Sequence, residues 1–186
     1  MTTAPKTTSQ VLAGAGPALV GALAVLLASA GDGWPPRRSA IAFMIGSWGA
    51  RLTVQRVYAR SPDGLLPTSS FKLLTFVLFF AVPAYFISRN VDDGFSTVEL
   101  VASAGWLIAF AGETTADRQW LRFTSKQENA GLPCRVGAWR HVPQAHAVFE
   151  TAIWGAFALF ASASPWGWIA WACPATMIYS HFTRRY

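Results

Sequence analysis

Two pairs of ionisable side chains have the spacing of groups that can carry out acid–base chemistry. Glu113 and Asp117 are four residues apart, and so are His146 and Glu150. Residues four apart lie on the same face of an α-helix, so each pair would present two titratable groups together. Each pair adjoins an apolar run, and a charge inside a membrane helix costs about 2.5–3.5 kcal/mol. We therefore expect the four side chains to line a water-filled pocket near a membrane surface.

A purely structural interpretation of the same acids stays open. The acids can also lie in the headgroup zone of a membrane and pair with neighbouring cations, namely Arg118, Arg122 and Arg140. For Asp117 the sequence does not separate the two interpretations. Glu150 is followed directly by an apolar run, which favours a buried role.

The histidines do not form a recognisable metal motif. They are His141, His146 and His181. No HxxxH or HxxHH box is present, and a single metal held by His141, His146 and Glu150 is conceivable but weakly supported. Nucleophile motifs and phosphate-binding glycine loops are also absent from the sequence. We therefore expect no metal.

The elements that must position these residues are predicted to be membrane helices. Of the 186 residues, 53% are hydrophobic and 13% charged, against about a quarter charged in soluble domains. The net charge of +6 comes from residues between the apolar runs, not from one amphipathic face. This distribution fits membrane topology better than a nucleic-acid interface, so membrane lipid is an expected partner and nucleic acid is not.

The apolar runs predict one all-α domain over residues 1–186, a polytopic membrane bundle of about six helices. A spanning helix needs about 20 mostly apolar residues. The predicted spans are 11–30, 39–57, 73–88, 98–116, 147–163 and 166–181, with a polar cytoplasmic loop over 117–146.

The basic residues predict the orientation of this bundle. All but three of the 15 Lys and Arg residues fall on one side of it, the exceptions being Arg37, Arg38 and Arg89. Cationic loops stay in the cytoplasm, so both termini should be cytoplasmic. A bacterial cytoplasmic (inner) membrane is the expected location.

The segment from Glu113 to Glu150 resembles the signature of a known family. It reads "ETTADRQWLRF", then "ENAGLPCRVGAWR", then a Glu ten residues after that Arg. This pattern is similar to that of the steroid 5α-reductase-like membrane family, which is related to isoprenylcysteine carboxyl methyltransferases and sterol reductases. "SWGARLTVQRVYAR" (Ser47 to Arg60) resembles an upstream segment of the family, so the resemblance covers about residues 47–175.

The resemblance implies a helix bundle whose cytoplasmic half encloses NADPH, or S-adenosylmethionine in the methyltransferase branch. A lipidic substrate would enter from the bilayer. Glu150 would be the catalytic acid at the substrate end. The residues implied to face the cofactor are Glu113, Asp117, Arg122, Asn129, Trp139, Arg140 and His146.

The sequence departs from the family where phosphate would be bound. The family's R-H-P-N-Y core is replaced by residues 143–147, with Pro143 at the Arg position and Ala147 at the Tyr position. Phosphate recognition needs charge-assisted donors, so dinucleotide binding should be weak. Family members also continue into a basic, aromatic tail, whereas this chain ends at "HFTRRY".

Three functions from different classes remain. We favour a non-catalytic membrane subunit or scaffold, derived from the enzyme family, that binds no cofactor and packs against other membrane protein subunits, lipid or pigment. The second is an NADPH-dependent reductase of a lipidic enone, such as a steroid or isoprenoid-like substrate. The third is an S-adenosylmethionine-dependent methyltransferase acting on a lipid or prenyl-cysteine.

Overall fold

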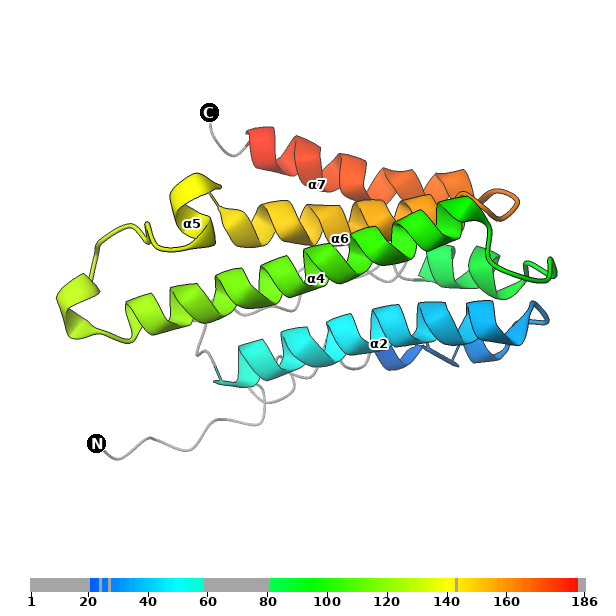
Figure 1. Ribbon diagram of the computed structural model, residues 1–186, viewed down its shortest axis with the longest axis horizontal. Coiled ribbons are helices and arrows are strands. Elements are labelled where there is room, and N and C mark those ends of the chain that lie inside the picture. The colour runs from blue at the N-terminus through cyan, green and yellow to red at the C-terminus, as the bar shows by residue number, and fades with distance from the viewer. Residues whose placement is uncertain (1–20, 24, 27, 59–80, 143, 184–186) are drawn as a thin grey trace. The chain divides into compact units, whose positions relative to one another are not determined.

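The computed structural model describes residues 21–23, 25, 26, 28–58, 81–142 and 144–183 (Figure 1). Every regular element within these ranges is helical, which confirms the all-α class. The chain divides into two compact units, Met1–Gly94 and Phe95–Tyr186. Each unit has its own buried apolar side chains, so the two are described in turn.

Across the ranges described, no helix combines the length and the apolarity that crossing a membrane requires. Of the predicted spans 11–30 and 73–88, residues 11–20, 24, 27 and 73–80 lie outside the described residues. The other four predicted spans coincide with helical segments, whose bounds follow.

The first unit is built around α2, Pro35–Tyr58. Proline is favoured at the first helical position, where its missing N–H has no intrahelical partner, so the helix begins four residues before the predicted span 39–57. Ile41, Ile45 and Trp48 are at most 1% exposed. Their spacing of four and three residues places them on one face, which forms the core of this unit. The unit also contains a helical segment over residues 81–88.

In the first unit, a buried arginine holds the chain that follows residue 88. Arg37 is 2% exposed and donates hydrogen bonds to the carbonyl oxygens of Asn90, Asp92 and Gly94 at 3.2, 2.6 and 2.6 Å. Its guanidinium also lies 5.6 Å from the ring centre of Trp34. The sequence used Arg37 only in the charge count that predicts membrane orientation. In the structure its side chain holds the segment after residue 88 through hydrogen bonds.

The second unit begins with α4, Thr97–Thr124. Its start is fixed by a capping box: the Ser96 hydroxyl accepts from the Glu99 N–H, and the Glu99 carboxylate accepts from the Ser96 N–H at 2.8 Å. Such caps stabilise a helix by about 1 kcal/mol. The predicted span 98–116 lies within α4, and the helix continues to Thr124, into the segment predicted as the polar loop 117–146. Arg122 in the last turn complements the helix dipole.

The helices α4 and α6, Ala145–Ala161, run antiparallel and pack side by side (Figure 1). Near one end the rings of Phe95 and Phe160 are 6.3 Å apart. Near the other end Gly112 meets Phe149, and a Cβ at position 112 would lie 2.4 Å from that ring. A side chain at position 112 would therefore force the Phe149 ring to move, and overpacking of this kind is destabilising.

The last element is a 3₁₀ turn followed by a helix, namely η2, Gly167–Trp171, and α7, Ala172–Thr183. The predicted spans 147–163 and 166–181 correspond to α6 and to this pair. Trp166 takes the left-handed conformation with φ 62°, and Gly167 lies so close to the Ala161 carbonyl that no Cβ would fit. The chain reverses here, and α7 packs back on α6.

Candidate functional site

The predicted acids lie on two helices that pack against each other. Glu113 belongs to the buried stripe of α4 and is 3% exposed, while Asp117 one turn later is half-buried. Glu150 is half-buried on α6. Glu113 and Glu150 directly follow Gly112 and Phe149, the two residues at the close helix crossing. The packing of α4 against α6 therefore brings these two acids to one level of the helix pair.

Trp139 connects the loop to both helices. It lies in the short helix α5, Ala138–His141, and its indole N–H donates to the Ala116 carbonyl at 2.8 Å. The indole also stacks on the imidazole of His146, with ring centres 5.2 Å apart and an interplanar angle of 30°. The structure thus brings together two of the residues that the resemblance assigned to a cofactor.

Gln119 is a residue that the site prediction missed. Its side-chain oxygen accepts a hydrogen bond from the Ala138 N–H at 2.8 Å, which joins α4 to the start of α5. Gly137 has φ 55°, and a Cβ there would lie 2.3 Å from the Gln119 amide nitrogen. The signal was present in the sequence, because Gln119 follows Asp117 by two residues in the same motif.

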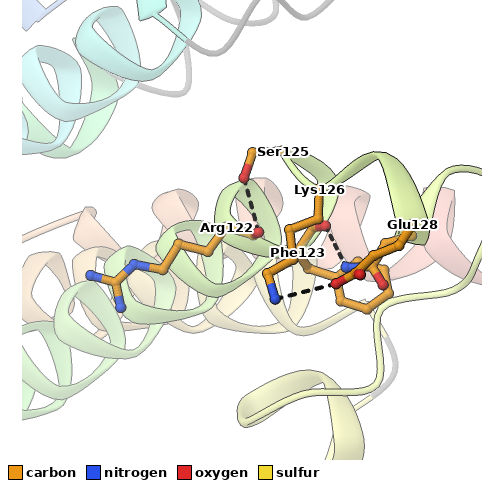
Figure 2. A network of polar contacts seen from close by, with 6 residues as sticks. Arg122, Phe123, Ser125, Lys126 and Glu128 are labelled. Carbon is orange, nitrogen blue, oxygen red and sulfur yellow. Dashed lines mark hydrogen bonds and ion pairs between the residues drawn. The ribbon is translucent and has the colours of Figure 1, made fainter.

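Asn129 bonds to the end of α4. It closes the 3₁₀ turn η1, Gln127–Asn129, and its side-chain amide donates to the Phe123 carbonyl at 2.8 Å. In the same turn Lys126 pairs with Glu128 at 3.4 Å. Figure 2 shows Arg122 extending away from this turn. The amide of Asn129 therefore adds a second donor to a carbonyl near the helix end that also accepts from the Lys126 N–H at 3.4 Å.

The remaining predicted residues lie at the surface or beside α7. Arg122, Arg140 and His146 are exposed. Glu150 is half-buried on α6, the helix that α7 packs against. Pro143, where the sequence departs most from the family pattern, lies outside the described residues, and the next residue, Gln144, has a left-handed φ of 55°.

No group of three or more His, Cys, Asp and Glu side chains in the part of the chain that the structure describes is arranged to hold a metal ion. The arrangement of His141, His146 and Glu150 that the sequence left conceivable is thus not formed as a metal site. Within those ranges both cysteines, Cys134 and Cys173, are free thiols.

The fold and the site define a helical protein whose motif residues are carried by α4, α5, α6 and the loop between α4 and α5. Residues 70–183 match the model of a family described as "Protein of unknown function (DUF1295)". The match covers more than half of the chain, and the chain belongs to this family. Neither a search of curated proteins nor a search of solved structures gave a match.

Proposed function

We propose that the protein is a non-catalytic membrane subunit or scaffold, descended from a steroid 5α-reductase-like enzyme. The proposal rests on the hydrogen bonds that the motif side chains form with the backbone of the loop and of α4. Asn129 and Trp139 both donate to backbone carbonyls of α4, and Gln119 accepts from a backbone N–H of α5. Polar groups used in this way stabilise the loop, and a cofactor would have to displace them.

The charges near the site also argue for a scaffold. Pyrophosphate is recognised by cations and aligned N–H donors, and the family's Arg position holds Pro143 here. Arg122 and Arg140, the two cations that the resemblance assigns to the cofactor, are exposed. They are therefore suited to contacts outside the protein.

The asymmetry of the second unit supports a place in a membrane. At one end, the turn after α6 exposes Trp166, Trp168 and Trp171 by 65, 62 and 45%. The opposite end carries the cationic loop. The 17 residues of α6 separate the two ends by about 25 Å, close to the hydrocarbon thickness of about 30 Å. Tryptophans favour membrane interfaces and cations the cytoplasmic side.

The outer face of α4 supports contact with lipid or other subunits. Leu100, Leu107 and Ile108 are 57, 57 and 71% exposed. These side chains would face lipid tails or partner helices in a membrane complex. The proposed subunit therefore combines an apolar contact face with a fixed polar loop.

A reductase is the alternative, and one observation favours it. Glu113 is 3% exposed within a helix, and a buried acid next to a helix crossing is a common feature of active sites. An acid in this position can polarise the carbonyl of a lipidic enone while NADPH supplies a hydride. The same acid in a scaffold would be held by a structural hydrogen bond.

Titration of the detergent-purified full chain with NADPH, followed by nicotinamide fluorescence, separates the two functions. The proposal predicts no saturable binding and no NADPH oxidation with enone lipids, and the same negative result with S-adenosylmethionine. Micromolar binding that Glu113→Gln abolishes and Arg89→Gln preserves would establish the enzyme instead. Arg89 is a suitable control because it is exposed in the first unit and far from the motif in sequence.

A further inference from the structure

One end of the second unit concentrates exposed positive charge. The last two turns of α4, the loop after it and α5 carry five basic side chains, all of them exposed. We call this set the basic surface: Arg118, Arg122, Lys126, Arg135 and Arg140. Between residues 118 and 142 the sequence contains one acid, Glu128, and it pairs with Lys126 at 3.4 Å.

The backbone beneath the basic surface is held in place. The Gln119 side chain binds the Ala138 N–H, the Trp139 indole binds the Ala116 carbonyl, and the Asn129 amide binds the Phe123 carbonyl, each at 2.8 Å. These contacts fix the loop at three points along α4. Positioning the cations in advance lowers the entropy lost when they bind a partner.

Exposed apolar side chains lie among the cations. Trp120, Leu132 and Val136 are 41, 58 and 44% exposed. Leu132 and Val136 lie within four residues of Arg135, in the loop itself. A surface that alternates cations with aliphatic and indole side chains matches the boundary between charged headgroups and acyl chains.

We propose that the basic surface binds the headgroups of anionic phospholipids in the cytoplasmic leaflet. The proposal rests on the membrane location proposed above and adds a lipid class to it. The cations meet the phosphates, while Leu132 and Val136 enter the acyl boundary. A nucleic acid offers the same phosphates, but it would leave these aliphatic side chains in water, so the lipid surface is the better fit.

Energy transfer from the loop to labelled lipid tests the proposal. Cys134 lies next to Arg135 and is partly exposed, so a donor dye can be attached there in the full-length Cys173→Ala chain. The protein is reconstituted in phosphatidylcholine nanodiscs that contain acyl-labelled phosphatidylglycerol or, in parallel, acyl-labelled phosphatidylcholine. We expect phosphatidylglycerol to be enriched at the loop at least about fivefold, since each cation contributes on that scale.

Three variants define the cause of the enrichment. The first variant replaces four arginines together by Gln, and the second replaces the same four by Lys: Arg118, Arg122, Arg135 and Arg140. The Gln variant should reduce the enrichment of phosphatidylglycerol over phosphatidylcholine to about one, and the Lys variant should preserve the enrichment. Arg89→Gln, outside the basic surface, should leave it unchanged. About 1 M salt, where the Debye length is about 3 Å, should abolish the enrichment. Circular dichroism confirms that each variant keeps its helices.

Several results would overturn the proposal. Equal energy transfer to labelled phosphatidylglycerol and labelled phosphatidylcholine, with the four arginines intact, would overturn it. An undiminished enrichment of phosphatidylglycerol in the four-Gln variant would also overturn it. If inorganic phosphate reduced the enrichment of phosphatidylglycerol more than chloride does at equal ionic strength, the surface would be a site for free anions. Tighter binding of a labelled oligonucleotide than of lipid would indicate nucleic acid. Recovery of the chain in the soluble fraction of cells would instead contradict the membrane location, which distinguishes the two failures.

Discussion

The two units fix their loops with different chemistry. In the first unit a charged side chain does so: Arg37, 2% exposed, binds three carbonyl oxygens. In the second unit neutral groups do so, among them the indole of Trp139 and the amide of Asn129. Loss of the buried Arg37 guanidinium would remove a charged donor from three carbonyl oxygens at once. Neutral contacts stabilise less, but they leave the cations of the second loop exposed for an external partner.

The largest loss of stability should come from replacing the buried Arg37. Arg37→Met keeps much of the side-chain volume but removes the donor to the Asp92 and Gly94 carbonyls and one of two donors to the Asn90 carbonyl. The free energy of unfolding should therefore fall by about 3 kcal/mol. Thermal unfolding in detergent, followed by far-UV circular dichroism, measures the loss. The control is Arg89→Met, which removes an exposed cation lying 4.8 Å from the ring of Tyr85. Equal losses in the two variants would show that the burial of Arg37 has no special role.

An intermediate effect should come from the glycine that precedes α5. Gly137→Ala places a side chain at φ 55° and against Gln119, which should cost about 2 kcal/mol. Gly131→Ala is the matched control, because it has a similar φ of 78° but open space around its Cβ. If the two substitutions destabilise the protein equally, backbone strain alone is responsible and the contact with Gln119 contributes nothing.

The smallest effect should come from a single neutral bond. Trp139→Phe removes the indole N–H but keeps an aromatic ring beside His146, so about 1 kcal/mol should be lost. Unfolding by a chaotrope in detergent resolves a change of this size. A loss as large as that of Arg37→Met would mean that the second loop depends on its contacts as strongly as the first, and the contrast between the units would disappear.

Sequence reasoning predicted the helical class and much of the second unit. The apolar runs located α4 and α6, and the interruption between the predicted spans 147–163 and 166–181 located the turn after α6. The sequence also predicted a helix for each pair of ionisable residues, and the two pairs lie on α4 and α6. These features depend on local periodicity and on the order of segments, which a single sequence displays directly.

Other features could not be predicted because they depend on partners distant in sequence. Arg37 binds carbonyls 53 to 57 residues away, and its type alone suggests a surface cation. The predicted span 98–116 ends where hydropathy declines, at Asp117, whereas the helix itself continues to Thr124. For Asn129, the residue type matched a cofactor motif, but its amide bonds to the carbonyl of Phe123.

The central claim is that the motif side chains serve the loop itself and not a cofactor. Hydrogen–deuterium exchange of the Ala138 amide, which donates to Gln119, tests it directly in the full chain. The account predicts slow exchange without any ligand, about fivefold faster exchange in Gln119→Ala, and no change when NADPH or S-adenosylmethionine is added. Fast exchange in the free protein that becomes slow only with one of these cofactors would contradict the account.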